Sequence, residues 1–242
     1  MRRHLRAVLA ASLLTLVAAG CNAGAESGAR DGDGSAPAED PNLSTVAESV
    51  VPEVAVFAEP GGAGEPIHVL GHPTPVGAPL VFLVDKREDD DWLQVFLPVR
   101  PNGSQGWIRT SDVQLSTHTF HIDVSLSNLR VTVYDGDEVI LDEPVGIGTS
   151  DTPTPGGRYY IKELLQPSNP NGGYGPYAYG LSGFSDQLTS FAGGDGVIGL
   201  HGTNDPSSIG RQVSHGCIRM SNEGITFLAG ILPLGVPVEI LP

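Results

Sequence analysis

Alternation of apolar and polar residues predicts a chain built mainly from β-strands. The clearest alternation lies in TFHIDVSL at 119–126 and NLRVTVYDGDEVILDEPV at 128–145. Asp135 and Gly136 interrupt the second segment and predict the turn of a hairpin. Two further strands are predicted in TPGGRYYIKELLQ at 154–166 and GVPVEIL at 235–241. The pattern therefore indicates an all-β, or mainly β, fold.

Four shorter apolar runs, separated by Gly, Pro and Asp clusters, precede these strands. They lie at 54–60, 78–85, 92–99 and 106–115, a spacing that predicts a small barrel or sandwich. The segments AEP, DWLQV and GWI within them resemble a bacterial SH3-like domain, here assigned to residues 49–115. Trp92 and Trp107 could form a peptide-binding surface or pack a small core.

One helix and one long loop complete the expected second domain, which spans residues 117–242. Ser221 is a candidate N-cap for a helix over 222–232, with Glu223 in its first turn and Pro233 ending it. Residues 166–196 are dense in Gly, Pro and Tyr and have no clear period, which predicts a functional loop. We expect one or two short helices in total.

The N-terminal residues predict export. Three arginines, an apolar run at 8–17 and small residues before Cys21 form a signal peptide over 1–20. A buried helix and a twin-arginine signal are the alternatives considered. The residues before Cys21 resemble a lipobox, which implies lipidation of that cysteine. A flexible linker at 21–48 would then tether the rest to the membrane, on the extracytoplasmic side and facing the cell wall.

Composition and charge exclude some partners. The chain has 242 residues, 32 Gly, 20 Pro and only 17% charged residues, which suits a β-rich protein with many turns. Its net charge is −15, and loss of the three N-terminal arginines would make it −18. So acidic a chain is not expected to bind nucleic acid through backbone phosphates.

With Cys21 assigned to lipidation, Cys217 is left without a partner for a disulfide. A thiol becomes a useful nucleophile beside a base, and His201 and His215 are the candidates. Glycines 202 and 216 would allow backbone amides to approach a substrate, and the set suggests acyl transfer. A buried structural cysteine and a zinc site of His201, His215 and Cys217 are the alternatives. Four other histidines are expected to be surface or barrel residues, namely His68, His72, His118 and His121.

HGT at 201–203, followed by SHGCIRM at 214–220, resembles the signature of the L,D-transpeptidase catalytic domain (YkuD family). The likeness includes TPTPGGRYYI at 152–161 and implies a β-sandwich catalytic domain. The family implies that Cys217 is the nucleophile and His201 the general base, oriented by the backbone of Gly202. It also implies oxyanion donors at the amides of Gly216 and Cys217. Substrate-binding roles are expected for Ser214, His215, Arg219, Tyr177 and Tyr179.

The resemblance implies a cysteine-dependent acyltransferase without metal or cofactor. Cys217 would take the acyl group of a peptidoglycan stem peptide as a thioester and pass it to a side-chain amine, giving a 3→3 cross-link. Alternatives are an L,D-carboxypeptidase, with water as acceptor, and a non-catalytic wall-binding lipoprotein. Carbapenem β-lactams are expected inhibitors. Tyr174, Tyr177 and Tyr179 could form a lid or merely pack their loop, and Arg219 could bind a carboxylate or form an internal salt bridge.

Overall fold

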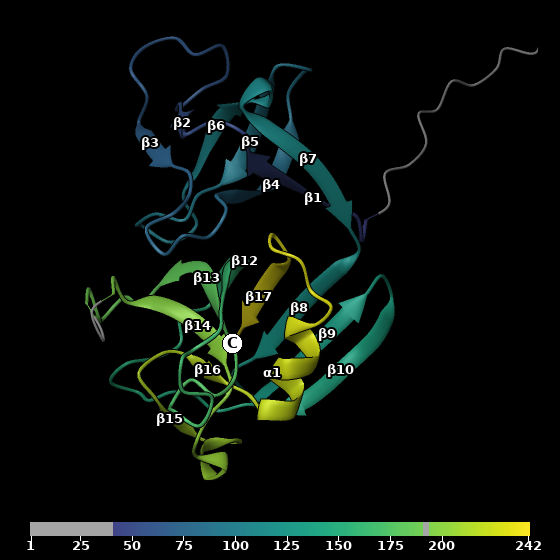
Figure 1. Cartoon of the computed structure of the whole chain (residues 1–242), viewed down its shortest axis with the longest axis vertical. Helices are drawn as coiled ribbons and strands as arrows, with labels where there is room; N and C mark the ends of the chain where they lie inside the picture. Colours follow the sequence, from purple (N-terminus) through teal and green to yellow (C-terminus); the bar gives the residue numbers. More distant parts are fainter. Residues whose placement is uncertain (1–40, 191–193) are drawn as a thin grey trace, which may run out of the picture. The chain divides into compact units, whose positions relative to one another are not determined.

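The computed structural model describes residues 41–190 and 194–242 (Figure 1). The predicted signal peptide, Cys21 and the linker up to residue 40 lie outside the described residues. Within the described ranges, no helix has the length and hydrophobicity needed to cross a bilayer.

Strands β1 to β7 form the first β-region. Their bounds are β1 Ser44–Ser49, β2 Glu53–Val56, β3 His68–Gly71, β4 Val81–Arg87, β5 Trp92–Phe96, β6 Gln105–Arg109 and β7 Val113–His118, with the 3₁₀ turn η1 Thr110–Asp112 before β7. Five strands make a sheet in the order β6-β5-β4-β1-β7, and β2 pairs with β3. The strands predicted in this region therefore exist, and the SH3-like assignment stays a prediction.

The structure corrects the end of the predicted linker. Residues 44–48 belong to strand β1, which pairs along its length with β7 and also with β4. Val46 and Ala47 are buried there, so these residues are part of a core and not of a tether. The segment STVAES was missed because Val46 is its only large apolar residue.

Strands β8 to β17 form the second region. Their bounds are β8 Phe120–Ser125, β9 Arg130–Asp135, β10 Glu138–Pro144, β11 Ile147–Gly148, β12 Gly157–Leu165, β13 Ala178–Phe184, β14 Val197–His201, β15 Gln212–Ser214, β16 Ile218–Arg219 and β17 Pro237–Leu241, with the 3₁₀ turn η2 Pro206–Ser208 and the helix α1 Asn222–Ala229. Eight of them form one sheet in the order β10-β9-β8-β17-β12-β13-β14-β16, and β11 pairs with β15. The mainly β fold class is confirmed.

The predicted hairpin and helix are present. Strands β9 and β10 pair antiparallel, and Gly136 takes the positive φ of 57° that their turn requires. Ser221 caps α1 by accepting a hydrogen bond from the Gly224 N–H, as predicted. The helix ends at Ala229, three residues before the predicted end.

The predicted long loop contains an interior strand of the sheet. Strand β13 lies within 166–196, between β12 and β14, and every one of its residues is buried. Its sequence AYGLSGF lacks β-branched residues, which is why its pattern does not indicate a strand. Burial on both faces favours the small residues found there.

Alternate residues of the strands build the main core. Ile122 and Val124 of β8 face Val131 and Val133 of β9 in a single buried cluster, and helix α1 adds Ile225 and other residues. In the first region, Trp92 and Trp107 are buried together with Phe57. Their burial favours core packing over a peptide-binding surface.

Candidate functional site

The site lies on one face of the four strands β12, β13, β14 and β16. On β14, Ile198 and Leu200 point into the main core, so Gly199 and His201 point to the opposite face. Strand β16 runs parallel to β14, with Leu200 opposite Ile218. This pairing places Cys217, directly before β16, beside Gly199 on the same face.

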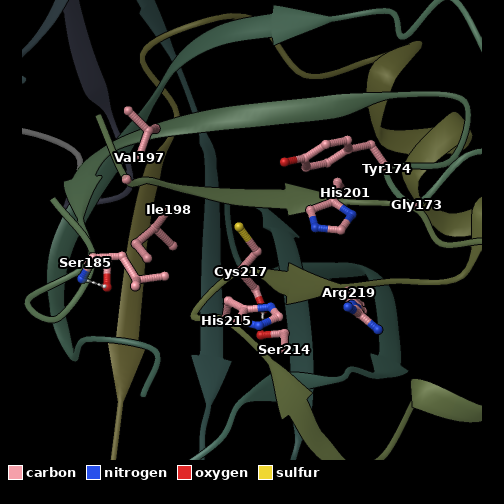
Figure 2. Close-up of a pocket in the computed structure, with 12 residues that line it drawn as sticks. Gly173, Tyr174, Ser185, Val197, Ile198, His201, Ser214, His215, Cys217 and Arg219 are labelled. Carbon is pink, nitrogen blue, oxygen red and sulfur yellow. Dashed lines mark hydrogen bonds between the residues drawn. The ribbon is translucent and has the colours of Figure 1, made fainter. Parts of the chain in front are cut away.

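Cys217 and His201 share one cavity. The cavity has a volume of about 260 Å³ and its walls include Tyr174, His201, Ser214, Cys217 and Arg219. Figure 2 shows the Cys217 sulfur and the His201 ring facing this space. A methyl group at Gly199 would lie 3.7 Å from both the Cys217 Sγ and the His201 Cδ2. Glycine at 199 therefore keeps the space between sulfur and imidazole clear.

The imidazole of His201 is held in a defined tautomer. Its Nδ1 lies 2.5 Å from the carbonyl oxygen of Gly202, and because a carbonyl can only accept, Nδ1 carries the proton. Nε2 is then unprotonated and can accept a proton from a thiol. Burial, together with the charge of Arg219, lowers the pKa of His201 to about 4, although the Gly202 hydrogen bond acts in the opposite direction.

The thiol of Cys217 is also neutral in the resting site. Burial raises its pKa, while the Gly199 N–H, 3.4 Å from Sγ, and the Arg219 charge act weakly the other way. A raised thiol pKa and a lowered imidazole pKa both favour the uncharged pair. The arrangement is suited to proton transfer during attack and not to a stored thiolate–imidazolium pair.

A hydrogen-bonded network fixes the chain after His201. The Thr203 N–H donates to Asn222 Oδ1 at 2.8 Å, which ties the HGT segment to the start of α1. Ser221, the N-cap, donates from its N–H (3.1 Å) and its hydroxyl (2.9 Å) to the carboxylate of Glu143. Contacts from β10 and from α1 thus help to fix the position of the base, His201.

The loop before Cys217 corrects one predicted role. The Gly216 N–H donates to Ser214 Oγ at 3.1 Å, and the Ser214 hydroxyl donates to the Cys217 carbonyl at 2.6 Å. The Gly216 amide is therefore engaged within the loop, which leaves the Cys217 amide as the candidate oxyanion donor. Ser214 shapes the loop, and its side chain is buried.

Arg219 and His215 also line the cavity. The structure shows no salt bridge from Arg219 to any of the described carboxylates, and its buried Nε has no hydrogen-bond partner there. This does not support the internal salt bridge considered above. His215 is exposed at the rim of the cavity.

The tyrosines differ from expectation. Tyr174 lies against the His201 ring, with ring centroids 4.8 Å apart and an edge-on angle of 67°, and it lines the cavity (Figure 2). Tyr179 is fully buried and its hydroxyl donates to the Leu228 carbonyl, which contradicts a substrate-binding role for its side chain. Tyr177 packs against the main core and is absent from the cavity wall.

No group of three or more His, Cys, Asp or Glu side chains in residues 41–190 and 194–242 is placed to hold a metal ion. The zinc alternative therefore has no support from the geometry of His201, His215 and Cys217.

Three residues of the site were not predicted from sequence. Gly199 had a usable signal, since a glycine two positions before a catalytic histidine on a strand shares its face. Asn222 and Glu143 had none, because their roles depend on contacts between distant segments.

Comparison with known proteins gives the family. A model of the L,D-transpeptidase catalytic domain, YkuD, matches residues 119–240. The putative L,D-transpeptidase YkuD of Bacillus licheniformis is 39% identical over 126 residues, which cover 52% of this chain and 68% of that protein. The chain therefore belongs to the L,D-transpeptidase (YkuD) family.

Solved structures give a weaker likeness. A mutant of Enterococcus faecium L,D-transpeptidase matches with a TM-score of 0.39 and 22% identity, over 50% of this chain and 49% of that one. Mycobacterium tuberculosis L,D-transpeptidase 3, in complex with a faropenem-derived adduct, matches with a TM-score of 0.42 and 16% identity, over 60% and 76%. The chain thus spans about half of the E. faecium structure.

Proposed function

We propose that this protein is a cysteine-dependent acyltransferase that cross-links peptidoglycan stem peptides. The observation that carries the proposal is that His201, at the end of β14, and Cys217, directly before the neighbouring strand β16, face one cavity in a chain of the L,D-transpeptidase family.

The chemistry follows from the neutral pair. Sγ of Cys217 attacks the carbonyl of the third residue of a tetrapeptide stem while His201 Nε2 takes the thiol proton. The oxyanion that forms is stabilised by the Cys217 N–H. The protonated His201 returns the proton to the departing D-alanine amine, which leaves a thioester. A side-chain amine of a second stem then attacks this thioester, with His201 again as base, and a 3→3 cross-link results.

The surroundings support roles for two further residues. Arg219 presents a cationic guanidinium to the cavity, suited to a substrate carboxylate. Tyr174 covers one edge of the His201 ring and would restrict water near the thioester, which favours the amine as acceptor. Hydrolysis at the same site would give an L,D-carboxypeptidase.

The anchoring of the protein belongs to the same proposal. Lipidation of Cys21 would hold the protein at the membrane, facing the wall, and the linker would extend the catalytic domain outward. Carbapenem β-lactams would acylate Cys217, as the family implies. The first β-region would have an accessory role.

The test is incubation of the full-length protein with purified sacculi, followed by muropeptide analysis. We expect 3→3 cross-linked products with the native protein, none with Cys217→Ala and a small residue of activity with His201→Ala. Cross-linking retained by Cys217→Ala would overturn the proposal. Tetrapeptides shortened to tripeptides without cross-links would identify the carboxypeptidase, and binding without any product would identify a wall-binding protein.

A further inference from the structure

A buried carboxylate lies on the same sheet face as the nucleophile. Glu163 on β12 pairs with Gly180 on β13, and Gly180 pairs with Gly199 on β14, which is beside Cys217. Cross-strand neighbours point to the same face. Glu163, Gly180, Gly199 and Cys217 therefore form a row across four strands, and all four line one groove.

The side chain of Glu163 extends along this row toward Cys217. A methyl group at Gly180 would lie 2.3 Å from Glu163 Oε1 and 2.8 Å from its carboxyl carbon, so the carboxylate lies directly over Gly180. The two glycines form a floor without side chains between the carboxylate and the sulfur. Strands are about 4.8 Å apart, which places the carboxylate roughly 10 Å from Cys217.

Only one of the two carboxylate oxygens of Glu163 has a polar partner in the described part of the chain. Its residue is 5% exposed, Oε1 lies 3.2 Å from the Lys162 ammonium, and Oε2 has no hydrogen-bond partner in the described part of the chain. A β-bulge between Ile161 and Glu163 lets Lys162 and Glu163 both line the groove. A buried carboxylate oxygen without a partner is costly, so a donor from a ligand is expected there.

We propose that Glu163 is a specificity-determining residue that binds a side-chain ammonium group on the third residue of the acyl donor. The inference rests on the proposed function, which places the carbonyl of that residue at Cys217. From the carbonyl carbon to the amine of a lysine-like side chain there are six bonds, which span about 7.5 Å when extended. Adding a hydrogen bond of about 2.8 Å gives a reach that matches the roughly 10 Å along the row.

This geometry places the side chain of the acyl donor, and not that of the acyl acceptor, at Glu163. The acceptor amine must reach the thioester itself, and a carboxylate two strands away cannot contact it there. A donor amine held at Glu163 is, by contrast, kept away from its own thioester. The same contact would therefore select a diamino acid and prevent self-reaction of the donor.

The test uses binding, so that it is independent of turnover. In the Cys217→Ala protein, Kd is measured by calorimetry for two tetrapeptide stems, one with L-lysine and one with Nε-acetyl-lysine at the third position. Glu163→Gln is expected to raise Kd for the lysine stem about tenfold to a hundredfold, and for the acetylated stem less than twofold. Glu239→Gln, which removes a half-exposed carboxylate paired with Arg158 on the same sheet, is the matched control and should change neither.

A second variant covers the possibility that Glu163→Gln does not fold. Gly180→Ala pushes the carboxylate out of its position and should weaken binding of the lysine stem selectively. In a Glu163→Ala background the same change should have no further effect, because the displaced group is gone. Equal weakening of both stems, or no weakening by either variant, would overturn the role of Glu163. Selective binding together with a failure of the native protein to form an acyl-enzyme would instead count against the proposed function alone.

Discussion

The neutral resting state of Cys217 and His201 predicts how acylation depends on pH. If His201 acts as base from its neutral form, the acylation rate follows the fraction of unprotonated imidazole. With a pKa of about 4, that rate should halve near pH 4 and be flat from about pH 5 upward. An ordinary histidine would place the midpoint near pH 6.5.

The two pKa shifts also argue against a stored thiolate–imidazolium ion pair. Burial raises the pKa of the Cys217 thiol and lowers that of His201 to about 4, so both shifts favour the uncharged pair over a thiolate beside an imidazolium. Iodoacetamide, which reacts with the thiolate, should therefore modify Cys217 only slowly at pH 7 and faster at alkaline pH.

The assay compares two reactions of the full-length protein between pH 3 and 10. Mass spectrometry follows acylation of Cys217 by a tetrapeptide stem and, separately, its alkylation by iodoacetamide. His201→Ala should remove most of the acylation and leave the alkylation midpoint where it was. His121→Gln, on β8 and stacked on Tyr134, is the control for a histidine outside the site. An alkylation plateau through neutral pH that disappears in His201→Ala would show an ion pair and refute the reasoning.

Three other substitutions test the contacts that position the site. Glu143→Gln weakens two hydrogen bonds at the N-terminus of α1 and should lower the free energy of unfolding by about 1–3 kcal/mol in urea titrations, whereas the exposed Glu138→Gln should not. Ser214→Ala removes both hydrogen bonds that shape the loop before Cys217 and should slow acylation about tenfold to a hundredfold. An unchanged rate would show that the loop holds its shape without them. Tyr160→Phe loses a buried hydrogen bond to the Val81 carbonyl, and calorimetry should show a loss of about 1 kcal/mol, with no change if that contact does not persist in solution.

The elements that were predicted correctly are those whose pattern is local. Strands β8, β9 and β10 follow from strict alternation, and the start of α1 follows from its serine cap. Strand β13 could not be predicted, because a central strand buried on both faces and rich in glycine has neither alternation nor β-branched residues. The end of the linker failed for a similar reason, since β1 is a short strand stabilised by its neighbours β4 and β7.

In the candidate site, too, local motifs were predicted correctly and features that depend on tertiary contacts were not. The motif around His201 and Cys217 indicated which residues meet, because those residues carry the chemistry themselves. The engagement of the Gly216 amide and the burial of Tyr179 depend on backbone geometry and on the depth of a strand. The role of Glu163 could not be predicted from the sequence for another reason. An acidic residue that follows a lysine on a strand ordinarily forms a solvent-exposed ion pair with it. Only the strand pairing, through Gly180 and Gly199, places Glu163 in the same row as Cys217.

The position of β17 has a consequence for how the catalytic domain folds. This strand comes last in the chain but lies fourth from the β10 edge of the eight-stranded sheet, between β8 and β12, and it pairs with β8 in parallel. The two halves of the sheet are joined through it alone, so the nucleophile and its base cannot acquire their final support before residue 241 has been synthesised. Closure of the sheet by β17 and formation of the site are thus coupled, and a substitution that weakens the β8–β17 pairing should also disturb the nucleophile and its base.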